Sequence, residues 1–366
     1  MTNDPSVKIY CMTHINFTPP KDRLYIPLCV GKAFRPEIEF SGDDTGDNIS
    51  HLNPYYAELS GIYWVWKNVH DADYVGICHY RRYLIDDKEN LLNKNQILKL
   101  LENNDVITTM LLELRSDYYT GFGCNHNIKD LDAATCVIKE MYPDYFKTYN
   151  DAIRSNRTYF GNMLICRKSL FDDYCKWLFS ILFEVQKRVN ADLYDNYQKR
   201  IFGFISEILL YVYLKHNNLK VACCKVGLIG EKKETALMKQ QLCEYFKACD
   251  YEKAHSYFNE CLKKRPDVLM EASDVFGELK LCMQIISTCE FEAAAGHPVI
   301  LTRTNDFTQL LELFRTVNKI AERKLSGKAT TEDLQFLSDN NVSREMLDIA
   351  LLLAKSADTI SSICYE

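Results

Sequence analysis

The chain lacks the short motifs that mark several common classes of enzyme. It contains no Gly-x-Gly-x-x-Gly fingerprint, no Walker P-loop, no Gly-x-Ser-x-Gly elbow and no His-Glu-x-x-His pair. These motifs place glycine backbone, a nucleophilic serine or two metal-binding histidines where the corresponding chemistry needs them. Their absence argues against a dehydrogenase, a nucleotide triphosphatase, an α/β-hydrolase and a zinc peptidase.

Paired cysteines are also missing, although the chain has 15 cysteines. No two of them show Cys-x-x-Cys spacing, and several lie inside apolar runs, as Cys78, Cys166, Cys175 and Cys282 do. A structural zinc site needs ligands paired at short spacing, so the sequence predicts no such site. The pattern is typical of buried, reduced thiols in a cytosolic protein.

Long apolar runs and an excess of positive charge are absent as well. Charged residues interrupt every apolar stretch well before the roughly 18 residues that a membrane span needs, and residues 1–5 do not begin a signal peptide. The net charge of −6 argues against nucleic acid as a partner. We therefore expect a cytoplasmic protein with, at most, a peripheral contact at the inner face of a membrane.

The length of 366 residues is enough for two domains. Strand and helix patterns alternate up to Gly230, whereas the chain from Glu231 onward shows helical patterns and little strand signal. We expect an α/β domain over residues 1–230 and a helical accessory domain over residues 231–366. Residues 249–266 resemble one tetratricopeptide-like unit, but no second copy follows at a fixed period.

The first domain contains apolar segments typical of strands, separated by helical segments. This alternation predicts an α/β fold with a mostly parallel sheet and helices on both faces. Asn53 and Pro54 suit the start of one helix, and Ser169 with Asp172 forms a capping-box pattern for another. Residues 18–31 and 116–132 are expected to be loops. The expected strands cover residues 7–13, 74–78, 105–109, 158–167 and 219–224, and a further helix covers residues 200–216.

Two adjacent arginines, Arg81 and Arg82, follow the apolar strand of residues 74–78, shortly after His79. The carboxyl end of a strand in an open α/β sheet is where ligands bind, and a guanidinium fork matches phosphate oxygens. In an extended strand the two side chains would point to opposite faces, whereas in a turn both could converge. The alternative is a salt-bridged strand end on the protein surface.

The acidic residues near this strand allow more than one interpretation. Asp71 and Asp73 match the spacing of an Asp-x-Asp metal motif, but they precede the strand and therefore indicate a helix-to-strand turn. Residues 43–50 combine short acids with a glycine, without the spacing of a calcium loop. That segment is either an ordinary solvated turn, a metal site or a contact to a ribose or uracil edge.

Glu207 and Asn162 are candidates for chemistry in the second half of the α/β domain. Glu207 is the only acid in an apolar helical segment, and partial burial would raise its pKa and suit a general base. A surface glutamate is the alternative. Asn162 lies inside an expected strand, where its amide needs partners. It holds either a sugar hydroxyl or a neighbouring loop.

An ordered set of sequence blocks over roughly residues 7–225 resembles one bacterial family. The family was long catalogued as a domain of unknown function in capsule, exopolysaccharide and O-antigen clusters, and it includes polysaccharide galactofuranosyltransferases. The helical tail lies outside the resemblance. The blocks are residues 46–59, 63–68, 73–83, 162–165, 174–179 and 202–207.

The resemblance implies a GT-A-like glycosyltransferase of the hexosyltransferase type. It would move a sugar, with galactofuranose as one candidate, from a UDP-sugar to a glycan or lipid-linked glycan in capsule, exopolysaccharide or O-antigen synthesis. Residues 79–82 would stand where related folds carry Asp-x-Asp, so arginines would replace a metal in neutralising the diphosphate. We therefore expect an inverting, metal-independent reaction without a cofactor. A retaining reaction, or manganese or magnesium held by Asp43, Asp44 or Asp47, is the alternative.

The resemblance also implies roles for individual residues. Glu207 is the expected base, and Arg81 and Arg82 are the expected catalytic clamp on the diphosphate. Asn162 is the expected acceptor or sugar contact. The expected donor-binding residues are Thr13, His14, Asp47, Asn48, Asn53 and His79.

The helical tail supports a rival hypothesis from a different class. The chain would then be a helical interaction or scaffold protein built on a catalytically inactive α/β domain. In either case, the tail could contact a membrane or a protein partner.

Overall fold

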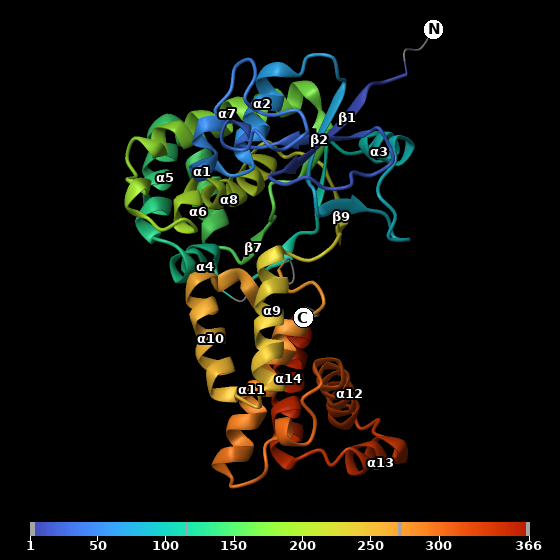
Figure 1. Cartoon of the computed structure of the whole chain (residues 1–366). Coiled ribbons are helices and arrows are strands. Elements are labelled where there is room, and N and C mark those ends of the chain that lie inside the picture. Colours follow the sequence, from blue (N-terminus) through green and yellow to red (C-terminus); the bar gives the residue numbers. More distant parts are fainter. Residues whose placement is uncertain (1–3, 115, 270–272, 364–366) are drawn as a thin grey trace. The chain divides into compact units, whose positions relative to one another are not determined.

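The computed structural model describes residues 4–114, 116–269 and 273–363. It divides into two compact units, Met1–Ile229 and Gly230–Glu366. The division falls one residue before the boundary expected from the sequence, where the strand signal ends. Figure 1 shows strands in the first unit and helices in the second.

The first unit contains a seven-stranded sheet in the order β2-β1-β3-β4-β9-β5-β8, with an additional pairing between β3 and β8. A small second sheet joins β6 and β7. The strands are β1 (Val7–Thr13), β2 (Tyr25–Cys29), β3 (Tyr74–His79), β4 (Arg82–Ile85), β5 (Val106–Thr109), β6 (Leu112–Glu113), β7 (Arg157–Thr158), β8 (Leu164–Arg167) and β9 (Val221–Leu228).

The expectation of a mostly parallel sheet is wrong. In the described part of the chain, β1 runs parallel to β2 and β3, and β5 runs parallel to β9. Strand β8 runs antiparallel to β3 and β5, and β4 runs antiparallel to β3 and β9. The sheet is mixed for two reasons: the chain reverses directly after β3 to form β4, and β8 enters beside β3 in the opposite direction.

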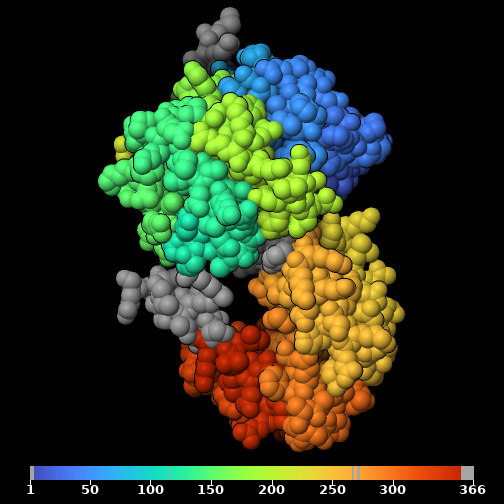
Figure 2. Space-filling model, turned by 90° about the vertical axis from the view of Figure 1, so that its left-hand side faces the viewer, coloured from blue at the N-terminus to red at the C-terminus, as the bar shows by residue number. Residues whose placement is uncertain are grey.

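Helices pack on both faces of this sheet, as the alternation of strands and helices predicts. Along β1, Tyr10 and Met12 pack into the core shared with the larger group of helices, whereas Ile9 and Cys11 pack into the core that includes α3. Figure 2 shows part of the larger layer from outside, with segments of α4 to α7 on the surface. The helices are α1 (Asn53–Tyr56), α2 (Leu59–Asn68), α3 (Lys94–Leu101), α4 (Tyr118–Asn125), α5 (Ile128–Met141), α6 (Pro143–Ile153), α7 (Lys168–Gln186) and α8 (Ile201–His216).

Both segments expected to be loops contain regular structure. Residues 18–31 include β2, and residues 116–132 include α4 and the start of α5. Asp117 caps α4 by accepting a hydrogen bond from the backbone N–H of Thr120 at 2.9 Å. Tyr118 and Phe122 are buried. Capping and tertiary burial therefore override the weak helix propensity of the glycines in α4.

The helix expected from Asn53 is interrupted. Ala57 adopts φ 50° and ψ −128°, so the chain forms the short α1 and then α2. Asn53 is the first residue of α1 and not its N-cap. A non-glycine residue with positive φ is strained and needs support from its surroundings.

Two further local predictions are wrong. The strand expected over residues 158–167 is split into β7 and β8, and Asn162 lies in the turn between them with φ 51°. The capping box at Ser169 is absent, because α7 begins at Lys168 and has no side-chain cap. The apolar pattern of residues 158–167 favours a continuous strand, so it gives no sign of the left-handed turn at Asn162.

The second unit is all helical over its described residues. Its core includes Leu242, Phe246, Phe258, Leu279 and Phe314. No helix in the described part of the chain is long and apolar enough to cross a membrane. The helices are α9 (Lys233–Lys247), α10 (Tyr251–Lys264), α11 (Glu278–Ala294), α12 (Phe307–Leu325), α13 (Thr331–Asp339) and α14 (Arg344–Ile363).

Candidate functional site

A tight hairpin carries the histidine and the two arginines predicted from the sequence. His79 ends β3 and pairs with Arg82 at the start of β4, so Tyr80 and Arg81 form the turn. The Tyr80 N–H donates to the Met12 carbonyl at 3.0 Å, and the Ile229 N–H donates to the Arg81 carbonyl at 2.9 Å. The hairpin is therefore fixed to the ends of β1 and β9.

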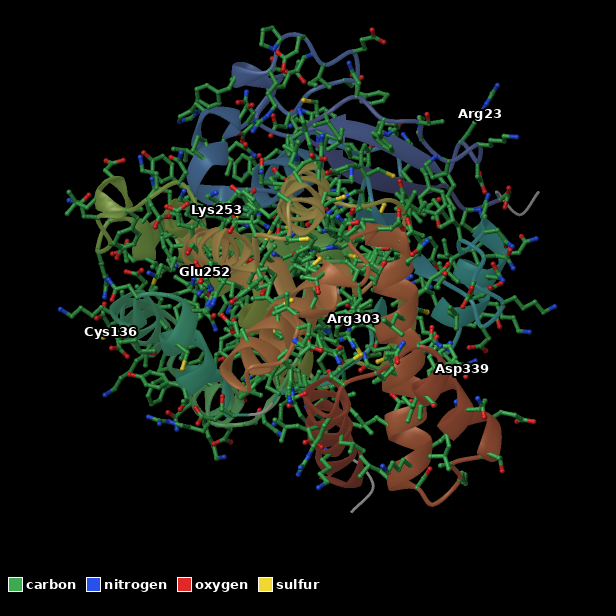
Figure 3. All side chains as sticks on the ribbon, turned by 60° about the horizontal axis from the view of Figure 1, so that its bottom comes forward. Arg23, Cys136, Glu252, Lys253, Arg303 and Asp339 are labelled. Atoms are coloured by element: carbon green, nitrogen blue, oxygen red, sulfur yellow. The ribbon has the colours of Figure 1, made fainter. Side chains whose placement is uncertain are left out.

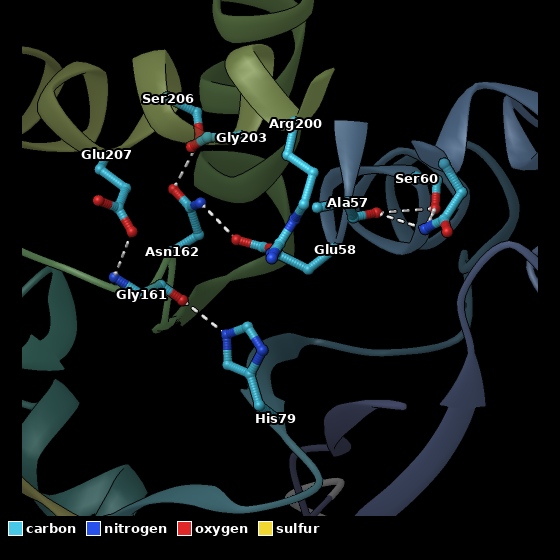
Figure 4. Close-up of polar contacts among 11 residues, drawn as sticks. Ala57, Glu58, Ser60, His79, Gly161, Asn162, Arg200, Gly203, Ser206 and Glu207 are labelled. Carbon is cyan, nitrogen blue, oxygen red and sulfur yellow. Dashed lines mark hydrogen bonds and ion pairs between the residues drawn. The ribbon is translucent and has the colours of Figure 1, made fainter. Parts of the chain in front are cut away.

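The turn at Gly161 connects this hairpin to α8. The ring Nε2 of His79 lies 2.6 Å from the Gly161 carbonyl oxygen, and the Gly161 N–H donates to Glu207 Oε1 at 3.4 Å (Figure 4). A carbonyl oxygen only accepts, so Nε2 of His79 must carry the proton. Gly161 adopts φ 93°, a conformation that favours glycine. One residue thus positions both His79 and Glu207.

Asn162 is buried and is held by two protein partners. Its Nδ2 donates to Glu58 Oε1 at 2.8 Å, and its Oδ1 accepts from the Ser206 hydroxyl at 3.1 Å (Figure 4). The asparagine therefore links α2 to α8, next to Glu207. Of the two roles considered from the sequence, these contacts match that of satisfying neighbouring segments.

Glu58 is a site residue that sequence reasoning missed. Its side chain is 14% exposed, and its Oε2 lies 3.8 Å from the Arg200 guanidinium. Burial would raise the pKa of Glu58, but His79, Arg200 and the Asn162 hydrogen bond together lower it. The helical pattern of residues 53–66 predicts an unbroken helix, so it gave no sign that the break at Ala57 places Glu58 here. The signal that could have found Glu58 was its position inside the first family-like sequence block, residues 46–59.

Glu207 and His79 have pKa values shifted in opposite directions. Burial, with a contribution from the charge of Glu58, raises the pKa of Glu207 to about 8, although Arg82, Gly161 and Arg200 oppose the shift. Burial is also the largest cause that lowers the pKa of His79. At neutral pH, Glu207 is therefore mostly protonated and His79 is neutral. We call Glu58, His79, Gly161, Asn162 and Glu207 the polar cluster.

The side chains of Arg81 and Arg82 have different surroundings. Arg82 influences the pKa values of both His79 and Glu207, which places its charge beside the polar cluster. Arg81 lines a separate cavity with Phe17 and Pro20. The two-residue turn therefore separates the two guanidinium groups, and the convergence considered from the sequence does not occur.

Two of the predicted donor-binding residues lie at the end of β1. Thr13 is buried, and its hydroxyl donates to the Ile15 carbonyl at 2.7 Å. His14 is exposed, and its ring packs edge-on against Tyr80 with centroids 5.3 Å apart. His14 is therefore near the hairpin turn, whereas Thr13 closes a local turn.

The other predicted donor-binding residues support backbone structure. Asn53 donates to the Ala57 carbonyl at 2.7 Å and thus stabilises the strained turn before Glu58. Asp47 accepts from the Tyr63 hydroxyl at 3.0 Å, and Asn48 donates to the Gly46 carbonyl at 3.0 Å. These contacts do not join the three residues directly to the polar cluster.

Asp43 and Asp47, two of the acids considered as metal ligands, have protein partners. Both oxygens of Asp43 are used, by the N–H groups of Gly31 and Lys32 at 2.9 and 3.0 Å. Asp71 pairs with Lys8 in the turn before β3, as the helix-to-strand interpretation predicts. Among the described residues, no group of three or more histidine, cysteine, aspartate or glutamate side chains is placed to hold a metal ion.

Seven of the 14 described cysteines are buried, whereas others, such as Cys124 and Cys136, are exposed. Cys78, Cys166, Cys175 and Cys282 are all buried, and the cysteines in the described part of the chain are free. Burial raises the pKa of the Cys166 thiol, which keeps it protonated and unreactive at neutral pH.

Comparisons with known proteins give one family and one related structure. A family model described as a domain of unknown function (DUF4422) matches residues 8–218. The chain is similar to a solved structure described as the apo form of the bifunctional glycosyltransferase WbbM, with 33% sequence identity and a TM-score of 0.58. That similarity covers 62% of this chain and 46% of the other, so the chain spans less than half the length of this relative. No curated protein matches the chain.

Proposed function

The chain belongs to the DUF4422 family, and from this premise we propose that it is a glycosyltransferase that uses a UDP-sugar as donor. The observation that carries the proposal is Glu207, a carboxyl with a pKa raised to about 8, beside the arginine-bearing end of a strand. Perturbed titratable groups gather at sites of chemistry. The glycosyltransferase with related structure supports the same class of reaction.

The proposed reaction is an inverting displacement. The acceptor hydroxyl oxygen forms a bond to the anomeric carbon while the bond between that carbon and the diphosphate breaks. Glu207, in its deprotonated form, takes the proton of the hydroxyl, and Arg82 balances the charge that develops on the leaving diphosphate. His79 is neutral and donates through Nε2 to Gly161, so it orients the turn that holds Glu207.

Arg82 is also the basis for proposing a reaction without a divalent cation. At the end of β3, where a GT-A-like enzyme would carry acidic ligands, this chain carries His79, Arg81 and Arg82. A guanidinium supplies positive charge to phosphate oxygens without a metal ligand set. Turnover should therefore persist in EDTA and gain little from added manganese or magnesium. Loss of turnover in EDTA, restored by manganese, would reject this part of the proposal.

The acceptor is proposed to be a growing glycan or lipid-linked glycan of a capsule, exopolysaccharide or O-antigen, with galactofuranose as one candidate for the transferred sugar. The enzyme would act in the cytoplasm or at the inner membrane face. These specifics rest on the family-like sequence blocks at residues 46–59 and 73–83.

The test uses the full chain and a panel of UDP-, GDP- and CMP-sugars. Thermal unfolding is measured with each donor, and release of the nucleoside diphosphate or monophosphate is then followed with and without EDTA. We expect UDP-sugars to raise the unfolding temperature and to be consumed. Failure of every nucleotide sugar to bind or react would overturn the proposed function.

A further inference from the structure

Arg81 is half-buried, and two of its guanidinium nitrogens are buried without a hydrogen-bond partner. Its Nε and Nη1 atoms are inaccessible to solvent and make no hydrogen bond in the structure. The guanidinium carbon lies 5.4 Å from the centre of the Tyr80 ring, which gives only a weak cation–π contact. Buried donors normally find partners, because an unsatisfied charged donor is costly. The missing partner indicates a ligand.

A cavity of ≈ 350 Å³ adjoins this guanidinium. Its walls are mostly apolar and come from the loop after β1, the hairpin turn and the residue that follows β9. The aromatic rings of Phe17 and Tyr80 lie with centroids 5.8 Å apart. The apolar lining consists of Phe17, Pro19, Pro20, Leu91 and Ile229.

The chemistry of this lining restricts the occupant. A sugar presents hydroxyl groups all around its ring and needs several hydrogen-bond partners, whereas the polar side chains of this lining are those of Thr18, Tyr80 and Arg81. A flat heterocycle can stack on aromatic and proline faces. A single guanidinium then suits a single phosphate group attached to that body.

We propose that this cavity binds the nucleoside of the donor, with the base against Phe17 and the prolines and the adjacent phosphate at Arg81. The proposal rests on the proposed function. Arg81 and Arg82 are neighbours in the hairpin, but their guanidinium groups lie in different surroundings. The donor would therefore cross the edge of the hairpin, with its nucleoside and the adjacent phosphate on the Arg81 side and its sugar-bearing phosphate on the Arg82 side.

The test compares ligands that carry different parts of a nucleotide. UDP, uridine, inorganic pyrophosphate and farnesyl phosphate are titrated calorimetrically into the full chain. Leu91→Trp fills the cavity, with Ile229→Trp as a second filling variant if the first unfolds. Arg81→Gln removes the charge. Arg23→Gln is the matched control, because Arg23 is exposed and extends from the surface of the first unit (Figure 3).

We expect UDP to bind the wild type and the control equally, and to bind Arg81→Gln and the filling variants at least about tenfold more weakly. Uridine lacks the phosphate, so only the filling variants should weaken it. Unchanged UDP affinity in both kinds of variant overturns the inference and leaves the proposed function intact. Farnesyl phosphate binding that depends on Arg81 and Leu91, with UDP unaffected, overturns it in favour of a lipid phosphate. Absence of any UDP binding or UDP-sugar turnover in the wild type removes the proposed function as well.

Discussion

Glu207 of the first unit and Glu292 of the second unit lie in different surroundings. In the second unit, Glu292 has a fully buried side chain, accepts from the Ile300 N–H at 2.6 Å and pairs with Arg303 at 2.9 Å. Lys239 and Arg315 lower the pKa of Glu278 in the same unit despite its burial. In the first unit, Glu207 has one long hydrogen bond of 3.4 Å, and its pKa is raised to about 8. The partners of Glu292 fit a structural role, whereas the poor compensation of Glu207 makes it the candidate for chemistry.

Replacing Glu207 should produce the largest effect on activity. Glu207→Gln keeps the shape and the acceptor for the Gly161 N–H but removes the base, so turnover should fall by about 10²- to 10⁴-fold with donor affinity retained. The steady-state rate and the calorimetric affinity for UDP are measured together. Glu39→Gln, an exposed glutamate in the same unit, serves as the control and should behave as wild type. Near-normal turnover of the Glu207 variant would show that another group removes the proton.

Replacing Glu292 should produce the opposite pattern, with a loss of stability and no loss of chemistry. Glu292→Ala leaves the Ile300 N–H and Arg303 without their acceptor, so the free energy of unfolding of the second unit should fall by about 1–3 kcal/mol. Urea unfolding followed by circular dichroism measures this change. The rate per folded molecule should stay within about twofold of wild type. A selective loss of turnover in a fully folded variant would contradict the assignment of Glu292 to structure.

The pH dependence of wild-type activity is the next, smaller effect. A base must be deprotonated to act, and the pKa of Glu207 in the free chain is about 8. The value of kcat/KM should therefore rise with pH, by about tenfold for each unit below this pKa, and level off above it. A profile that is already flat from pH 6 upward would exclude Glu207 as the base. When the donor is bound, its negatively charged diphosphate would raise the pKa of Glu207, so the midpoint of the kcat profile would lie at a higher pH than that of kcat/KM.

The elements that carry this site differ in how far the sequence predicts them. Strand β1 and helix α8 follow local apolar patterns, and the sequence places them within one residue. The hypothesis that Glu207 is a base also follows from the sequence, where it is one acid among apolar neighbours. These features depend on neighbours along the chain, which is why a single sequence suffices.

The remaining parts of the site depend on contacts distant in sequence. Gly161 and Asn162 form a left-handed turn because Glu58, Ser206 and Glu207 hold it from other elements. Local patterns instead favour a continuous strand there. The antiparallel entry of β8 and the divergence of Arg81 from Arg82 are likewise set by strand pairing, which periodicity alone does not specify.

Of the changes at the candidate site, replacing Glu58 should alter activity least. Its result distinguishes an electrostatic role in the first unit from the structural role of Glu292 in the second. Glu58→Gln keeps an oxygen that can accept from Asn162 Nδ2 but removes the negative charge that raises the pKa of Glu207. The midpoint of the kcat/KM profile should therefore move to lower pH, with a loss in the plateau of less than about tenfold. Glu39→Gln again provides the control with an unshifted midpoint. If Glu58 only held the turn in place, as Glu292 holds its loop, the plateau would fall and the midpoint would stay where it is. A shifted midpoint instead indicates that Glu58 tunes the base electrostatically.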